Sequence, residues 1–283
     1  MASQITRISA DGHLHIHPLF RLDQALEHLN ANLNRNFRIF RNRNPAPMLK
    51  LVFLVEGSSS RFFEQLRDRP EDYSAMGLAI VSRKETLGLT LVYRNTERIC
   101  LIAGKQVATQ ERLEVLGLAM DESIPDGLPL RETIDRIIAG GGFPVLTWAP
   151  GKWWGQRGRI VRDFVEASLS RGTRSQPGRL ALGDSSLRPV GWPEPAIMRT
   201  AREHGLPIIP GSDPLPLPGE ERQMGAYGFV YEGPFDLEHP VTSARALLTG
   251  DPGRIIPAGR RNNLFQVIDR LHRLRKTKQK IEP

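Results

Sequence analysis

Histidine recurs at every second position near the start of the chain, in the segment ADGHLHIHPLF at 10–20. Asp11 precedes His13, His15 and His17 at the same spacing, and the whole chain has only seven histidines. Because residues two apart on a β-strand share a face, these four side chains would point to one side of a strand. Imidazole nitrogens are common ligands of zinc and related divalent ions. The segment therefore predicts a metal site near the end of a strand.

Strand geometry limits how many of these side chains can bind one ion. A strand rises about 3.3 Å per residue, so the segment from Asp11 to His17 spans roughly 20 Å. Neighbouring histidines, about 7 Å apart, can still converge on one ion. The candidate pairs are His13 with His15, or His15 with His17. The alternative is that these are surface histidines, or core histidines that have hydrogen-bond partners.

A late apolar segment, LPIIPGSD at 206–213, supplies a carboxylate that could join the histidines. Two histidines and Asp213 would form a set that leaves one coordination position open for water, as hydrolytic zinc sites do. The alternative is that Asp213 starts a turn before Pro214. We expect His13, His15 and Asp213 to be the metal ligands.

Other apolar stretches also end in polar residues. Glu56 follows LVFLV and Asp184 follows LALG, and we expect these carboxylates to be the catalytic residues, with helix capping or a turn as the alternative for each. The remaining candidates lie after two of the apolar stretches and would bind an anionic substrate: Trp148, Lys152, Arg157 and Arg188. Lysine and arginine bind phosphate and carboxylate, although exposed charge of this kind is common on any surface.

The elements that would position these residues alternate between strand and helix. We expect strands at 5–16, 48–56, 143–150, 178–186, 206–213 and 225–233, and helices at 22–33, 128–142, 158–172, 193–205, 239–250 and 262–278. Such alternation is typical of an α/β protein with a mostly parallel sheet. The pattern favours one (β/α) barrel domain over 1–268, with a distorted seven-stranded form as one version, and a β-meander insertion at about 75–120. Residues 269–283 would form a basic C-terminal helix or tail.

Composition narrows the class of protein. The 283 residues are 40% hydrophobic and 25% charged, which permits a large core and excludes wholesale disorder. The chain has no run of 18 apolar residues, so no membrane span is predicted. Its single cysteine, Cys100, excludes an internal disulfide. With no signal-peptide pattern, we expect a cytoplasmic protein. The net charge of +8 is concentrated at 35–50 and 270–280, and such segments attract phosphate esters, nucleic acid or acidic lipid.

Three motifs together resemble a known family. DGHLH at 11–15, IPDGLPLRETIDRIIAGGGFPVLTWAPGKW at 124–153 and GLPIIPGSD at 205–213 are similar to motifs of the PHP family, the polymerase and histidinol phosphatase metal-dependent phosphoesterases. The resemblance implies a barrel in which His13 and His15 bind metal, with Asp11 behind them. The late Asp-x-His motif of the family matches Asp213.

The chain departs from the family at several ligand positions. Trp148 stands where the family has a metal-binding histidine before proline, and SDPLP at 212–216 lacks the late histidine. No histidine occurs between His28 and His204. A trinuclear site therefore cannot form. The remaining residues could hold one ion, or two ions with help from Glu56 and Asp184.

Three functions remain open from the sequence. The first is a metal-dependent hydrolase, in which His13, His15 and Asp213 hold Zn²⁺ or Mn²⁺ and water attacks the phosphoester of a small anionic substrate. The second is a catalytically inactive barrel that binds an anionic ligand or a protein partner. The third is a nucleic-acid-associated protein that uses the two basic segments. The sequence does not determine the oligomeric state.

Overall fold

The computed structural model describes residues 5–82, 84–94, 97–170 and 180–281. Within these ranges the strands are β1 (Ile5–Leu14), β2 (Met48–Glu56), β3 (Leu78–Ser82), β4 (Gly88–Tyr93), β5 (Glu97–Ala108), β6 (Glu114–Leu118), β7 (Phe143–Thr147), β8 (Ala181–Ser185), β9 (Ile208–Gly211), β10 (Tyr227–Pro234) and β11 (Ile256–Gly259). The helices are α1 (Leu22–Asn36), α2 (Phe62–Asp68), α3 (Leu130–Ala139), α4 (Gly155–Ser170), α5 (Ala196–Glu203), α6 (Pro240–Thr249) and α7 (Leu264–Ile281). Short 3₁₀ helices are η1 (Phe37–Phe40), η2 (Pro70–Met76), η3 (Glu220–Gln223) and η4 (Pro252–Arg254). The expected positions 171–172, 178–179 and 282–283 lie outside the described residues.

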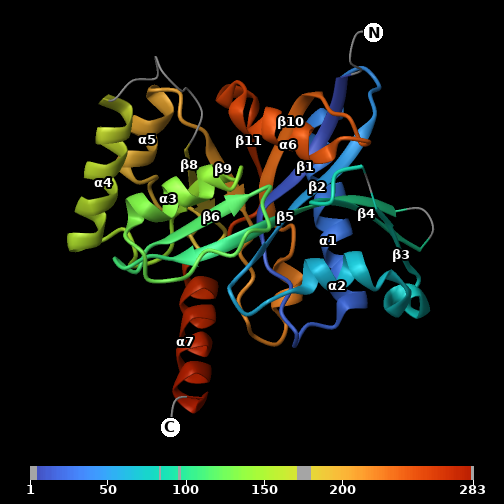
Figure 1. Cartoon of the computed structure of the whole chain (residues 1–283), viewed down its shortest axis with the longest axis horizontal. Coiled ribbons are helices and arrows are strands. Elements are labelled where there is room, and N and C mark those ends of the chain that lie inside the picture. Colours follow the sequence, from blue (N-terminus) through green and yellow to red (C-terminus); the bar gives the residue numbers. More distant parts are fainter. Residues whose placement is uncertain (1–4, 83, 95–96, 171–179, 282–283) are drawn as a thin grey trace.

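The strands form one mixed sheet in the order β11-β10-β1-β2-β5-β6-β7-β8-β9. Parallel pairs join β1 to β2, β2 to β5, β7 to β8 and β8 to β9, whereas β5–β6, β6–β7, β1–β10 and β10–β11 are antiparallel. Figure 1 shows helices lying around this curved sheet. The predicted α/β barrel class is therefore confirmed, with antiparallel members in a wall that was expected to be mostly parallel.

The barrel closes where β9 meets the end of β1. The backbone N–H of Asp213 donates to the carbonyl of His13 at 2.9 Å. Gly211 allows this approach, because a Cβ atom there would lie 2.5 Å from the backbone nitrogen of His13. Gly12 does the same from the other side, since its Cβ would lie 2.8 Å from the carbonyl oxygen of Pro210. Two glycines thus let the first strand and the last parallel strand come into contact.

The predicted β-meander is present as the antiparallel run β3–β4–β5–β6. The local pattern did not predict that β5 and β6 also belong to the barrel wall, as the strand order shows. The first part of β5, from Ile99, runs parallel to β2, and its second part, from Gly104, pairs with β6. Within the described residues only β3 and β4 lie off the main path of the sheet.

Both faces of the sheet are buried. Leu51, Phe53 and Val55 of β2 pack into one apolar cluster that includes α6, whereas Val52 and Leu54 pack on the other side against α1 and α2. A third cluster joins β6, β7 and β8 to α3, α4 and α5. This explains why β2 reads as a continuous apolar run rather than an alternating one.

Helix α7 extends away from the body, and Figure 1 shows the C-terminus at its far end. The helix begins at Leu264, so the predicted domain boundary at residue 268 falls inside it. Its first half packs on the barrel, where the side chain of Arg270 is buried. No helix among the described residues has both the length and the apolar character needed to cross a membrane.

Candidate metal centre

The three expected ligands lie together at one end of the barrel. His13 is on β1, His15 follows β1 by one residue, and Asp213 follows β9 by two residues. One potential ligand atom from each lies within 4.8 Å of the other two. The Nε2 atoms of His13 and His15 are 2.9 Å apart, and each is 3.8 Å from Oδ1 of Asp213. Of the two histidine pairs left open by the sequence, His13 and His15 are the pair that the structure groups with Asp213.

The chemistry of this donor set fits a divalent cation. Nδ1 of His15 lies 2.7 Å from the carbonyl oxygen of Val55, so this nitrogen carries the proton and Nε2 presents its lone pair. Burial, together with nearby His13, lowers the pKa of His15 to about 3, and the ring is neutral at ordinary pH. One imidazole nitrogen from each histidine and a carboxylate oxygen lie close together, as in a three-ligand zinc set that leaves a fourth position open.

The carboxylate of Asp213 is held in an ionised state. Burial alone would raise the pKa of Asp213, but its electrostatic interactions with the adjacent His13 and His15 rings, the Ser185 hydrogen bond and the charge of Arg270 together bring it below the usual value. The hydroxyl of Ser185 donates to Oδ2 at 3.0 Å, which leaves Oδ1 facing the histidines. The residue has a φ of 48°, in the left-handed region that aspartate tolerates better than most residues.

Asp11 supports the site from behind, as the family resemblance implied. Its carboxylate is fully buried and accepts the backbone N–H groups of His13 at 3.1 Å, Ser212 at 2.9 Å and Gly225 at 3.0 Å. The hydroxyl of Ser212 also donates to it. Burial raises the pKa of Asp11, and these hydrogen bonds act in the opposite direction. The carboxylate thus ties β1 to the segment after β9, where the ligands sit.

Two supporting residues were not assigned to the site from the sequence. The side-chain carbonyl of Gln106, on β5, lies 3.1 Å from Nε2 of His13. Arg270 of α7 donates to the backbone carbonyl of Asp213 at 3.3 Å and forms a buried ion pair with Glu220 at 2.6 Å. Gln106 lies within a strand and belongs to no motif. Arg270 looked like one more cation of a basic tail.

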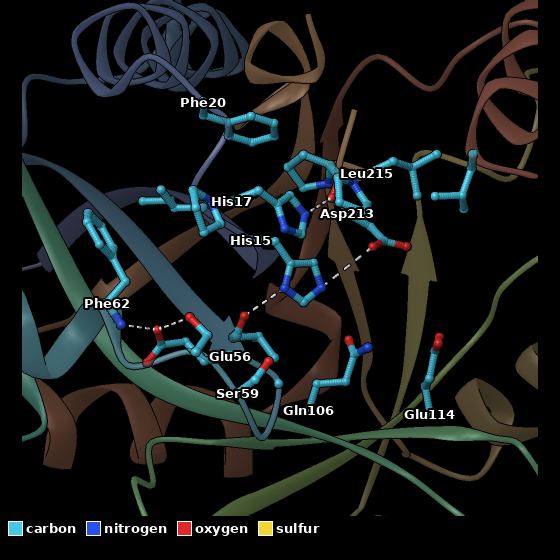
Figure 2. A pocket seen from close by; sticks show the side chains of 18 of the residues that line it. His15, His17, Phe20, Glu56, Ser59, Phe62, Gln106, Glu114, Asp213 and Leu215 are labelled. Carbon is cyan, nitrogen blue, oxygen red and sulfur yellow. Dashed lines mark hydrogen bonds and ion pairs between the residues drawn. The ribbon is translucent and has the colours of Figure 1, made fainter. Parts of the chain in front are cut away.

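The cluster opens on a cavity of about 860 Å³ (Figure 2). His15, Asp213, Gln106, Glu114 and Glu56 all line it, and Figure 2 shows the carboxylate of Glu56 directed toward Phe62. Lys152 also lines the cavity, with Nζ 2.5 Å from a carboxylate oxygen of Glu114. A volume of this size is typical of a site for a small molecule.

Glu56 lines the cavity but already has hydrogen-bond donors. Its buried carboxylate accepts the hydroxyl of Ser60 at 2.7 Å and the backbone N–H of Phe62 at 2.5 Å. A longer contact to the N–H of Phe63 measures 3.4 Å. These partners lie at the start of α2, so the carboxylate caps that helix. This is the arrangement that the sequence left as the alternative to catalysis.

The remaining expected site residues lie outside the cavity lining. Asp184 and Arg188 form a buried bidentate ion pair at 2.6 and 2.7 Å, and the hydroxyl of Tyr227 donates to Asp184 at 2.7 Å. Trp148 packs in the core beside β7, and Arg157 donates to the carbonyl of Gly151 at 2.9 Å. Glu56 and Lys152 therefore line the same cavity as His15 and Asp213, whereas these four residues do not.

No family model and no curated protein matches this chain. Solved structures do. PsfC from Pseudomonas syringae PB-5123 is 12% identical, with a TM-score of 0.54 over 98% of this chain and 99% of that one. A two-domain protein from Bacteroides vulgatus ATCC 8482, described as containing a predicted PHP-like metal-dependent phosphoesterase, is 12% identical with a TM-score of 0.48 over 90% of this chain and 66% of that one. The lesion-specific endonuclease PfuEndoQ from Pyrococcus furiosus is 14% identical with a TM-score of 0.47 over 89% and 59%.

At this level of identity the likenesses show the fold alone. This chain shares its overall fold with PsfC over nearly the full length of both chains, and the PHP resemblance rests on the sequence motifs. The chemistry must be argued from the residues of this chain.

Proposed function

We propose that this protein is a metal-dependent hydrolase of the phosphoesterase type that acts on a small anionic substrate. The observation that carries the proposal is the convergence of His13, His15 and Asp213 within 4.8 Å beside a cavity of about 860 Å³. These three residues would hold Zn²⁺ or Mn²⁺. A bound ion of this kind polarises a phosphoryl oxygen and makes water a better nucleophile.

The side chains next to the three proposed ligands would orient them or contact the substrate. The hydrogen bond from His15 to Val55 fixes the ring orientation, and Ser185 orients the carboxylate of Asp213. Gln106 presents an amide next to His13, where it can hydrogen-bond to a substrate oxygen or to water. Lys152 is the one predicted anion-binding residue that lines the cavity, and it is paired with Glu114. Asp184, Arg188, Trp148 and Arg157 are left out of the proposed site.

A specific observation favours the alternative of a barrel that binds an anionic ligand without turnover. The two carboxylates expected to act in catalysis are both engaged, Glu56 with the start of α2 and Asp184 with Arg188. A general base would then have to come from another group, such as Glu114 beside Lys152. Turnover therefore has to be measured separately from binding.

The deciding experiment measures metal binding and hydrolysis on the same preparations. Isothermal titration with Zn²⁺ and Mn²⁺ should give a site of micromolar affinity or tighter, and His13→Ala and His15→Ala should each weaken it at least tenfold. His17→Ala is the matched control, because its Nε2 lies 3.0 Å from the Pro214 carbonyl, outside the ligand set. Loss of binding only in the first two variants, with Mn²⁺-dependent release of phosphate from a phosphoester panel, supports the proposal. Metal binding without any release supports the inactive barrel, and absence of metal binding in the wild-type protein rules out the metal-dependent hydrolase.

A further inference from the structure

The cavity beside the metal ligands has a wall of apolar side chains that the proposed chemistry does not use. They come from four separate parts of the chain: the segment after β1, the start of α2, the segment after β9, and α7. They include Ile16 and Phe20 after β1, Phe62 at the start of α2, Leu215 after β9, and Leu271 and Leu274 of α7. Because they converge from distant positions in the sequence, the wall is a product of the fold rather than of one apolar segment.

Several of these side chains remain partly open to the cavity. Ile16, Phe62, Leu271 and Leu274 are half-buried, whereas most apolar residues of the sheet are fully buried. When an apolar group of the ligand covers this apolar surface, water is released from it and binding becomes stronger. The wall therefore matches a substrate with an apolar body.

The charges that line the cavity point to a single anionic group on that substrate. Lys152 is paired with Glu114 at 2.5 Å, and Glu56 accepts hydrogen bonds from Ser60 and Phe62. Arg61, at the rim, has only a 3.7 Å contact with Glu64, and its side chain is 76% exposed. Among the described residues lining the cavity, the cation left to bind an anion is thus Arg61, in addition to the proposed metal site. A polyanion would need several such cations.

We propose that the ligand of this cavity is an amphiphilic anion: one phosphate, or a group of the same charge, carried by an apolar chain or ring. The anionic head lies toward His15, Asp213 and Gln106, and the apolar body lies against Leu271, Leu274 and the segment after β1. This rests on the proposed function for the position of the head. It makes the C-terminal helix, which reads as a basic tail in the sequence, one wall of the binding site.

The test uses n-alkylphosphonates of two to ten carbons, which present the same head and are not hydrolysed. Their dissociation constants for the full-length protein are measured by calorimetry with Zn²⁺ or Mn²⁺ present. Burial of each methylene group should strengthen binding about fourfold until the cavity is filled. Affinities that do not change with chain length overturn the proposal, as does a deoxyoligonucleotide that binds more tightly than the octyl compound.

Two variants locate the apolar wall. Leu271→Ser and Leu274→Ser should reduce the gain per methylene, while the affinity for ethylphosphonate stays within about twofold. Phe265→Ser is the matched control on the same helix, because Phe265 is 82% exposed and lies outside the cavity lining. An equal effect of all three substitutions would overturn the role assigned to α7. The chain-length series on the wild-type protein needs no variant to fold.

The same series separates this inference from the proposed function. A chain-length dependence without hydrolysis of any phosphoester leaves the inference standing and removes the hydrolase. Rapid hydrolysis of small polar phosphoesters without a chain-length dependence supports the hydrolase and overturns the amphiphilic-ligand inference.

Discussion

The backbone N–H of Asp213 donates a hydrogen bond of 2.9 Å to the carbonyl oxygen of His13, a residue 200 positions earlier in the chain. Both residues also direct side chains at the candidate metal centre, where Oδ1 of Asp213 lies 3.8 Å from Nε2 of His13. The contact that closes the barrel is thus also the contact that assembles the ligands. Closure of the barrel and assembly of the candidate ligands therefore depend on the same contact between β1 and the segment after β9.

Substitution of Gly211 by alanine should weaken both the closure of the barrel and the binding of metal. A Cβ atom at this position would lie 2.3 Å from Cβ of His13 and 2.5 Å from its backbone nitrogen. Backbone atoms cannot move aside as a flexible side chain can, so β9 must shift away from β1. We expect a loss of about 1–3 kcal/mol in the free energy of unfolding and metal binding at least tenfold weaker. Urea unfolding and calorimetric titration with Zn²⁺ measure the two effects.

Gly57→Ala is the matched control, because no atom lies within 4 Å of the Cβ it would carry. This change should leave stability and metal binding close to those of the wild-type protein. If Gly211→Ala behaves like Gly57→Ala, the close approach of β9 to β1 does not position the ligands.

Much of the fold could be predicted because it is encoded locally. The strand expected at 48–56 is β2 residue for residue. The histidine pair was predicted from a strand period of two, but β1 has a register shift between Asp11 and Leu14 and ends at Leu14, so His15 lies just beyond the strand. Asp213 was found because polar residues at the ends of parallel strands gather at one edge of a barrel. Each of these signals lies within about ten residues of the chain.

The rest depends on pairing between distant segments. Nothing local distinguishes the part of β5 beside β2 from the part beside β6, because strand partners are chosen by long-range packing. Glu56 reads equally as a base or as a cap until the N–H of Phe62 is placed beside it. Arg270 meets Glu220 across 50 residues, and no spacing rule predicts that contact.

The ion pair between Arg270 and Glu220 should be needed for stability. Both side chains are buried, and Arg270 also reaches the hydroxyl of Ser186 and the carbonyl of Asp213. Arg270→Met leaves the carboxylate of Glu220 buried without its cation, which should cost about 3–5 kcal/mol of unfolding free energy. Metal affinity should also fall, by roughly tenfold, because the backbone of Asp213 loses a donor.

A second substitution separates charge from packing. Glu220→Gln combined with Arg270→Met removes the unpaired charge and should restore part of the lost stability, as measured by urea unfolding. Arg273→Met, on the same helix, is the control, since Arg273 is half exposed and donates to the carbonyl of Pro218. An equal loss in Arg273→Met and Arg270→Met would contradict a specific role for the buried pair.

Glu56 offers a test between capping and catalysis. Because its carboxylate accepts the N–H of Phe62 and the hydroxyl of Ser60, Glu56→Ala should lower the free energy of unfolding by about 1–3 kcal/mol. Zinc affinity, measured by calorimetry, should stay within about twofold. Glu56→Gln keeps an oxygen acceptor and should be less harmful to stability. If Glu56→Gln abolishes phosphoester hydrolysis while stability is unchanged, the carboxylate has a catalytic role that its hydrogen bonds do not reveal.

The buried His15 predicts a specific pH dependence for the metal-free protein. Its pKa is lowered from 6.5 to about 3, mainly by burial, so the unfolded chain binds a proton at this ring at pH values where the folded chain does not. Protonation therefore favours unfolding. The stability contributed by the neutral ring is complete above about pH 6.5 and declines as the pH falls toward 3, by at most about 1.4 kcal/mol per pH unit. Urea unfolding in chelator at pH 7, 6, 5 and 4 gives the slope.

His15→Gln isolates the contribution of this ring, because other acid-sensitive groups are common to both proteins. The variant should lose stability less steeply between pH 6 and 4 than the wild-type protein does. His204→Gln is the control, since His204 is exposed and bonds only within α5 and its end. Parallel pH profiles for the wild-type protein and His15→Gln would show that the folded chain protonates His15 as readily as the unfolded chain. The ring would then be neutral only above its ordinary pKa of about 6.5, and burial would not keep its lone pair available at lower pH.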